Sequence, residues 1–258
     1  MKSNKLPIII AGILLFMSFN CLAIAIVFYQ LEDKVTNFRY SDVNEYNIVH
    51  EGTELINKLP IQFNIINQYF GSFDNLEEET RQKILMGYAL KNRIHTYECG
   101  IGNNSLCIKV EDLKTEELSN TFHTKTEFKL EEIKIYMDDY GPRDVKLDKE
   151  NGVYTVELDN DNNFNRKYTK FSHYQQLKDS YIFYVYEGFY KANCTKGEII
   201  DLQDFLTGDI IYSNICDENH GFKVEKEETI KNLQLYKYEL KKDKNNQLYI
   251  AGYNPVRG

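Results

Sequence analysis

The sequence has no Trp, only 4 Pro among its 258 residues, and no tract rich in Gly, Ser or Pro. The low Pro and Gly content excludes a collagen-like chain, and the missing tracts leave no obvious flexible linker. Hydrophobic residues make up 42% and aromatic residues 14% of the chain, which excludes an intrinsically disordered protein. We therefore expect one or two folded domains.

Motifs of common catalytic and cofactor-binding sites are also missing. The sequence contains no H-E-x-x-H, G-x-x-x-x-G-K-S/T, G-x-G-x-x-G or G-x-S-x-G pattern. Asp159, Asp161 and Asn163 stand at the first, third and fifth positions of a calcium loop, but Phe164 replaces the Gly that the loop requires. The sequence thus predicts no catalytic residue, no metal site and no cofactor.

Charge is absent from one long segment, Leu6 to Tyr29, which has 24 residues. A helix of that length rises about 36 Å, enough to cross a hydrocarbon core of about 30 Å. A cleaved signal peptide is the alternative, but its apolar region is usually about 7 to 15 residues long. The apolar residues that follow the small pair Ala23 and Ala25 favour an uncleaved anchor.

The charges that flank this segment predict its orientation. Lys2 and Lys5 precede it, and Glu32 and Asp33 follow it, which places the N-terminus in the cytoplasm of a single-pass plasma-membrane protein. The predicted organisation is a cytoplasmic tip at 1–5, a transmembrane signal anchor at 6–29 that contacts the lipid bilayer, a juxtamembrane stalk at 30–46 and an extracytoplasmic α+β domain at 47–258.

The region outside the membrane is acidic. Residues 31–258 hold 29 bases against 39 acids, and the whole chain has a formal charge of -8. Binding to a phosphate backbone needs clustered Lys and Arg, so nucleic acid is excluded as a partner.

Four cysteines lie beyond the apolar segment: Cys99, Cys107, Cys194 and Cys216. Cys99 and Cys107 bracket a Gly- and Asn-rich turn, which favours a disulfide between them and leaves Cys194 to pair with Cys216. Sequence alone allows three pairings, and free thiols are a further alternative. A zinc site is disfavoured because there is no C-x-x-C pair.

The pattern of apolar residues changes from helical to strand-like along the chain. Helical spacing occurs around residues 55–69, where Pro60 must interrupt it, and at 75–95 and 111–122, with Asn75 as the expected N-cap of the second helix. Strands are predicted at 106–110, 128–137, 153–158, 181–190, 208–214, 233–240 and 247–253. The predicted fold is α+β, with helices packed on a curved antiparallel sheet.

This order of elements over residues 50–258 resembles the cone-shaped nuclear-transport-factor-like and cystatin-like folds. The final segment, YKYELKKDKNNQLYIAGYNP at 236–255, resembles the closing hairpin of membrane-anchored envelope proteins of low-GC Gram-positive bacteria. The resemblance implies a curved sheet and an extracytoplasmic location, and it implies no functional residue.

One strand is unusually aromatic, and its rings are candidates for a pocket or a partner surface: Tyr181, Phe183, Tyr184, Tyr186, Phe189 and Tyr190. Packing in the core is the alternative. The favoured function is non-catalytic binding or scaffolding of an envelope protein or cell-wall ligand. The second hypothesis is an envelope hydrolase, which would need two carboxylates about 5 to 10 Å apart in one concave pocket. The candidate carboxylates are Asp138, Asp139, Asp201, Asp204 and Asp209.

Overall fold

A computed structural model of the chain describes residues 43–65, 70–100, 104–114, 116–125, 127–138, 140–158, 163–193, 199–205, 207–215 and 227–256. The chain divides into two compact units, Met1–Tyr46 and Asn47–Gly258, and the second contains the fold. The predicted anchor at 6–29, the stalk up to residue 42, Cys194 and Cys216 lie outside the described residues. Within the described ranges, no helix has both the length and the apolar character needed to cross a bilayer.

The helices come mainly from the first half of the chain: α2 (Val43–Lys58), α3 (Ile61–Ile65), α4 (Glu78–Lys91), α5 (Glu116–Phe122) and the short α6 (Glu227–Ile230), with single 3-10 turns η1 (Phe73–Asn75) and η3 (Asp112–Lys114). Pro60 separates α2 from α3, as predicted, because proline cannot continue the hydrogen-bond ladder of a helix. The prediction of Asn75 as an N-cap is wrong. Asn75 closes η1, and Glu77 is the N-cap residue of α4, without a side-chain capping bond.

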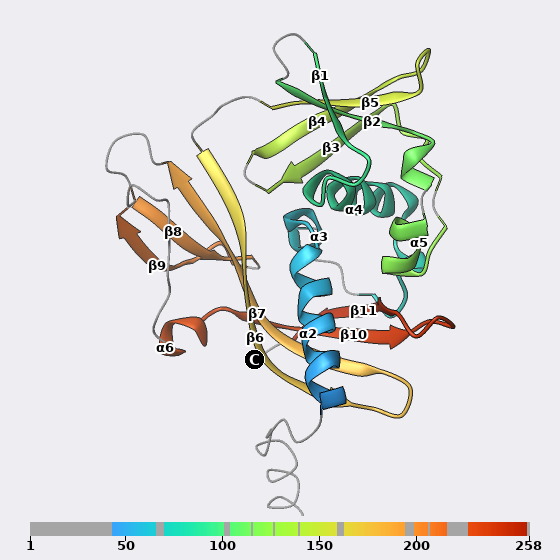
Figure 1. Cartoon of the computed structure of the whole chain (residues 1–258). Coiled ribbons are helices and arrows are strands. Elements are labelled where there is room, and N and C mark those ends of the chain that lie inside the picture. The colour runs from blue at the N-terminus through green and yellow to red at the C-terminus, as the bar shows by residue number, and fades with distance from the viewer. Residues whose placement is uncertain are drawn as a thin grey trace, which may run out of the picture. The chain divides into compact units, whose positions relative to one another are not determined.

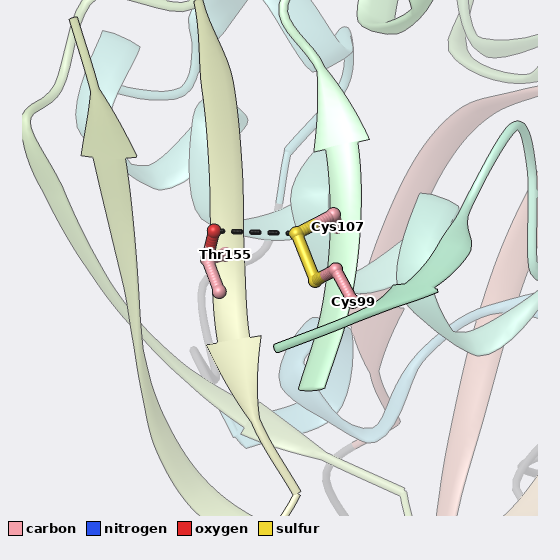
Figure 2. The surroundings of a disulfide bond; sticks show 3 residues. All are labelled: Cys99, Cys107 and Thr155. Atoms are coloured by element: carbon pink, nitrogen blue, oxygen red, sulfur yellow. Dashed lines mark hydrogen bonds between the residues drawn. A yellow bond between two sulfur atoms is a disulfide. The ribbon is translucent and has the colours of Figure 1, made fainter. Parts of the chain in front are cut away.

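Five strands form the first antiparallel sheet, in the order β1 (Tyr97–Cys99), β2 (Ser105–Lys109), β5 (Val153–Glu157), β4 (Gly141–Asp148) and β3 (Glu132–Met137). Cys99 on β1 and Cys107 on β2 form a disulfide with sulfur atoms 2.05 Å apart, the pair that the intervening turn favours. Figure 2 shows this bond and the contact of Cys107 Sγ with Thr155 Oγ1 on β5, at 3.3 Å. The disulfide therefore ties the short edge strand to its neighbours.

The second antiparallel sheet is built on β7 (Tyr181–Asn193), which pairs along one edge with β6 (Asn163–Gln176). The other edge of β7 serves two partners in turn: residues 181–187 pair with β10 (Gln234–Lys242), and residues 188–192 pair with β8 (Ile199–Asp204). The outer strands are β11 (Leu248–Pro255) beside β10 and β9 (Ile210–Ile215) beside β8. Figure 1 shows the two pairs of strands diverging from the long β6–β7 ribbon.

Helices α3, α4 and α5 lie between the two sheets, whereas α6 lies away from the first sheet (Figure 1). Helices α3 and α4 contact β3 of the first sheet, whereas α5 and η1 contact β11 of the second. Helix α2 lies against β7, where Gly52 faces the ring of Phe183. Buried apolar residues of both sheets and of the helices form one continuous cluster. This core gives the unit an α+β fold with antiparallel sheets, as predicted.

The arrangement differs from the prediction in one respect. The sequence predicted one curved sheet, but its strands belong to two sheets. Four strands, β1, β4, β6 and β8, were not predicted, and each pairs with a predicted strand. The physical reason is that strand pairing depends on residues far apart in the chain, such as β2 with β5 in the first sheet and β7 with β10 in the second, which no local pattern announces.

Candidate functional site

A charged cluster lies inside the apolar core of the second sheet. Along β7 the side chains of Phe183, Val185 and Glu187 share the core face, because alternate residues of a strand point the same way. Glu187 is fully buried, and the Lys167 side chain on β6 is only 2% exposed. Buried charges are rarely found without partners, so the contacts of these two residues decide whether the cluster is stable.

Every oxygen of the Glu187 carboxylate has a partner. Lys167 Nζ lies 2.6 Å from Glu187 Oε1. The Tyr238 hydroxyl and the Asn64 amide donate to Oε2 at 2.7 and 2.5 Å. Lys167 Nζ also lies 5.8 Å from the centre of the Tyr238 ring, a cation–π geometry. The cluster therefore compensates its buried charges locally.

The buried environment shifts the protonation of this cluster. Burial lowers the pKa of Lys167, while the neighbouring Glu187 carboxylate opposes that shift. Burial and the charge of Glu187 raise the pKa of the Tyr238 and Tyr253 hydroxyls well above 10. Both phenols thus remain protonated at neutral pH and can act as hydrogen-bond donors.

A second charge pair lies at the junction of the helices with the first sheet. Lys91 Nζ, in the last turn of α4, lies 2.9 Å from Asp138 Oδ2 and donates to the Leu59 carbonyl at 2.7 Å. Asp138 Oδ1 accepts the Ile61 backbone N–H at 2.8 Å. This pair joins the α2–α3 corner to α4 and to the end of β3. It also acts on the Lys167–Glu187 pair: the positive charge of Lys91 lowers the pKa of Lys167, and the negative charge of Asp138 raises the same pKa.

Lys91 and Asp138 of the second pair and Lys167 of the first line a cavity of about 380 Å³. Its lining residues come from α4 and the following turn, from the end of β3 and from β6: Gly87, Leu90, Lys91, Arg93, Met137, Asp138, Tyr140, Arg166 and Lys167. We call this space the basic cavity. Leu90, Met137 and the Lys167 side chain are buried, whereas Arg93 and Arg166 are exposed and lie at its mouth.

The basic cavity is unusual in its charge. Four of its nine lining residues are Lys or Arg and one is an acid. In the whole chain, 31 of 258 residues are Lys or Arg, and acids outnumber them. Two of these four bases, Lys91 and Lys167, are paired with Asp138 and Glu187, so the cavity is rich in charged groups whose charges are largely compensated within the protein.

Arg93 reaches the cavity from a strained position in the backbone. It follows α4 in a Schellman turn, in which the Ile94 N–H donates to the Ala89 carbonyl at 2.9 Å and the Arg93 N–H to the Leu90 carbonyl at 3.3 Å. The φ angle of Arg93 is 55°, a region that Gly adopts at lower cost. An arginine at this position is therefore not required by the turn itself.

The aromatic residues of β7 do not come together in one pocket of the described structure. Phe183 is fully buried and lies in the core. The other five each have a different neighbour. Measured between ring centres, Tyr184 lies 4.3 Å from His173, Phe189 5.3 Å from Phe205 and Tyr190 5.6 Å from Tyr168. The ring centre of Tyr181 lies 6.0 Å from Lys242 Nζ, and Tyr186 borders a separate cavity of about 190 Å³. Core and edge packing accounts for most of these rings.

The candidate carboxylates already have structural contacts, and two of them are backbone neighbours, since the Asp204 N–H donates to the Asp209 carbonyl at 3.0 Å. Asp138 is the only acid among the described residues that line the basic cavity. Asp201 accepts a bond from Ser213 Oγ, and the buried Asp204 accepts the backbone N–H groups of Thr207 and Gln234. Asp209 is exposed, and Asp139 lies outside the described residues.

Metal ligands do not gather either. Within the described ranges, no group of three or more His, Cys, Asp or Glu side chains could hold a metal ion. The observed cluster and cavity were missed by the sequence prediction, although Glu187 was a visible signal: it is the one acid within the aromatic run of β7.

Comparisons of the chain with protein-family models, with curated proteins and with solved structures found no match. The basic cavity is therefore interpreted from its own chemistry.

Proposed function

We propose that this chain is a membrane-anchored, non-catalytic binding protein of the cell envelope, whose outer domain holds a ligand in the basic cavity. The observation that carries this proposal is the cavity itself. Its volume of about 380 Å³ lies within the range of small-molecule sites, about 300 to 1,000 Å³. Five of its nine lining residues are charged, so it is more polar than the usual small-molecule site, and a polar ligand suits it better than an apolar one.

The contacts of the cavity residues favour binding over catalysis. Lys91 and Asp138 are held by each other and by backbone groups of Leu59 and Ile61, so both act as supports. Lys167 is held by Glu187. A hydrolase of the carboxylate-pair type needs a second acid facing the same pocket. The described lining of the basic cavity offers Asp138 alone, and no specific observation favours this alternative.

The location is part of the proposal. The uncharged segment 6–29 and the flanking Lys2, Lys5, Glu32 and Asp33 support a single pass with the N-terminus in the cytoplasm. The likeness to nuclear-transport-factor-like or cystatin-like envelope domains is retained as a proposal for the β6, β7, β10 and β11 part, where antiparallel strands pack on α2. The division into two sheets counts against it.

Protease access tests the location. The full chain carries one epitope tag before Met1 and another after Gly258, and intact protoplasts are treated with an external protease. We expect loss of the C-terminal tag and survival of the N-terminal tag, with an internal soluble protein as the control for lysis. Survival of both tags, or loss of the N-terminal tag alone, would contradict the proposed orientation.

Native mass spectrometry tests the binding role. The full chain is purified from its own membranes in a mild detergent, beside the variant Arg93→Glu, which reverses a charge at the exposed mouth of the cavity. We expect a bound molecule on the wild type and reduced occupancy on the variant. If the wild type retains no molecule, and repeated captures from solubilised membranes return no envelope component, the binding role is refuted.

A further inference from the structure

We propose that Lys167 and Asn64 become joined by a covalent amide bond, which forms when the Lys167 amine displaces ammonia from the Asn64 side-chain amide. Glu187, which contacts both residues, carries the proton between them. This self-modification of the buried cluster does not depend on a ligand in the basic cavity. Three observations support it: the placement of the two reacting groups, their enclosure away from water, and an amide oxygen that has no hydrogen-bond partner.

The two reacting groups meet at opposite oxygens of one carboxylate. Lys167 Nζ lies 2.6 Å from Glu187 Oε1, and Asn64 Nδ2 donates to Glu187 Oε2 at 2.5 Å. The register of the strands explains the first contact, because Lys167 pairs with Phe189 and therefore lies diagonally opposite Glu187 on the same face of the β6–β7 ribbon. Asn64 reaches the same carboxylate from α3. The carboxylate thus holds the amine next to the amide.

The buried environment makes the Lys167 amine a nucleophile. Only an unprotonated amine can attack a carbonyl carbon, and a buried lysine is more readily deprotonated than an exposed one. Burial lowers the pKa of Lys167, and the nearby charge of Lys91 lowers it further. The Glu187 carboxylate opposes this shift, but it is also the group that can accept the proton at 2.6 Å. The amine and its base are therefore in contact.

Aromatic rings enclose the amide and limit its contact with water. Asn64 is 1% exposed and Glu187 is fully buried. The ring centre of Phe63 lies 6.0 Å from that of Tyr238 and 4.7 Å from that of Tyr253, and both tyrosine hydroxyls lie within 3.4 Å of Asn64 Nδ2. Exclusion of water suppresses hydrolysis of the amide, which is the competing reaction. The amine is thus the favoured nucleophile at this carbon.

The reaction balances without any further reactant. Lys167 first gives one proton to Glu187, which leaves a neutral amine and a neutral carboxylic acid. The lone pair of Nζ then forms a bond to Asn64 Cγ, and the Cγ–Nδ2 bond breaks with its electron pair on nitrogen. Glu187 gives its proton to the departing nitrogen and takes one from the attacking nitrogen. The products are a secondary amide, ammonia and a carboxylic acid that is still protonated.

The reaction relieves two costs of the buried cluster. The charges of Lys167 and Glu187 are lost, and with them the cost of keeping two ions away from water. The protonated Glu187 also gains an O–H group to donate. Among the described residues, Asn64 Oδ1 is a buried acceptor without a hydrogen-bond partner. Donation from Glu187 to this oxygen would satisfy it.

Mass spectrometry of the full chain, purified from membranes in detergent and with its cysteines reduced, tests the inference. We expect the wild type to be lighter than its sequence by one ammonia. Trypsin should release a branched peptide in which residues 59–81 are attached to residues 167–170, because an acylated Lys167 is no longer a cleavage site. Fragmentation of this peptide should locate the bond at Asn64 and not at Asn67 or Asn75.

Three variants separate the bond from the ion pair. Lys167→Arg keeps a positive charge beside Glu187, but a guanidinium stays protonated and does not attack an amide. Glu187→Gln removes the proton carrier with little change in shape. Both variants should keep the full mass and give no branched peptide. Lys170→Arg changes an exposed lysine of the same strand and is the matched control, so it should be linked as the wild type is.

The wild type alone decides the main point, even where a variant fails to fold. A wild type of full mass overturns the inference. Loss of ammonia without the branched peptide, as in a cyclic imide at an asparagine, overturns it as well. A bond that still forms in Glu187→Gln overturns the role given to Glu187. Ligand occupancy of the basic cavity is measured separately, so none of these outcomes refutes the binding role.

Discussion

At the scale of single residues, the buried pair of Lys167 and Glu187 is the most consequential feature of the chain. Both side chains are almost completely removed from water, which costs several kcal/mol per ion before their attraction and hydrogen bonds compensate. The compensation depends on both partners being present. Removal of one leaves the other charged, buried and unpaired, which is worse than having neither.

We therefore predict that Lys167→Met lowers the free energy of unfolding by about 3 to 5 kcal/mol. The double variant Lys167→Met with Glu187→Gln should recover at least half of that loss, because a neutral amide can still bond to Asn64 and Tyr238. Urea unfolding of the full chain in detergent, followed by circular dichroism, measures both values. Lys146→Met is the matched control on the surface. A double variant less stable than the single one would show that the ion pair is not the cause.

The same residues explain why sequence reasoning missed the site. Glu187 was visible as an acid in an aromatic strand, but its partner Lys167 lies on a polar strand that carried no strand-like alternation. The register of β6 shifts between Phe171 and His173, so its inward residues change parity at that point. A period-two pattern is lost across such a bulge, and no strand was predicted over β6.

At the scale of elements, the branching of the second sheet depends on Gly188. This residue is the point at which β7 stops pairing with β10 and starts pairing with β8. A Cβ atom there would lie 2.5 Å from the Gln203 carbonyl oxygen and 2.8 Å from a methyl of Leu233. The backbone oxygen cannot turn away as a flexible side chain could, so the strands themselves would have to separate.

Gly188→Ala should accordingly lower the free energy of unfolding by about 1 to 3 kcal/mol, the usual cost of overpacking a well-packed site. Gly71→Ala is the matched control, since a Cβ at that glycine meets nothing within 4 Å. Its effect should stay within about 0.5 kcal/mol. Thermal unfolding of the two variants side by side measures the difference, and equal melting temperatures would contradict the role assigned to Gly188.

The elements that sequence predicted well are those whose signals are local. Buried and more exposed residues alternate along β5 and β10, and the Asn151–Gly152 turn before β5 places Gly152 at a φ of 62°. Strand β11 is instead marked by a short apolar run. The end of α2 is also a local signal, because Pro60 alone prevents the helix from continuing. Strand β4 was missed because only Gly141 and Val145 of its eight residues are buried, so its exposed face dominates the pattern.

At the scale of the whole described unit, the helices join the two sheets into one core. Residues of β3, β5, β7 and β10 belong to the same buried cluster, together with those of α4 and α5. Because the two sheets share one core, unfolding of either sheet would expose buried apolar residues of the other, and the unit is expected to unfold cooperatively. The Lys91–Asp138 pair adds a polar tie at the junction of the helices with the first sheet.

We expect the two sheets to unfold together. Hydrogen exchange of the full chain is measured by mass spectrometry at increasing urea concentrations. Peptides of β5 and β7 should show the same opening free energy, close to the free energy of global unfolding. Lys167→Met changes a residue of the second sheet only, yet it should lower the opening free energy of β5 in the first sheet as well. Loss of protection in β7 at urea concentrations that leave β5 protected would show two independent units.

The sequence by itself determined the α+β class, the terminal hairpin and the turn that favours the Cys99–Cys107 bridge, because each depends on residues close together in the chain. Its prediction of a membrane anchor at 6–29 rests on the same kind of local signal and stays a prediction. Only the tertiary structure decided that the strands form two sheets, that Lys91 pairs with Asp138 and Lys167 with Glu187, and that Lys91, Asp138 and Lys167 line one cavity. Lys91, Lys167 and Glu187 come from α4, β6 and β7, and Asp138 follows β3, so the partner of each charge lies far away in the sequence and is known only from the folded structure.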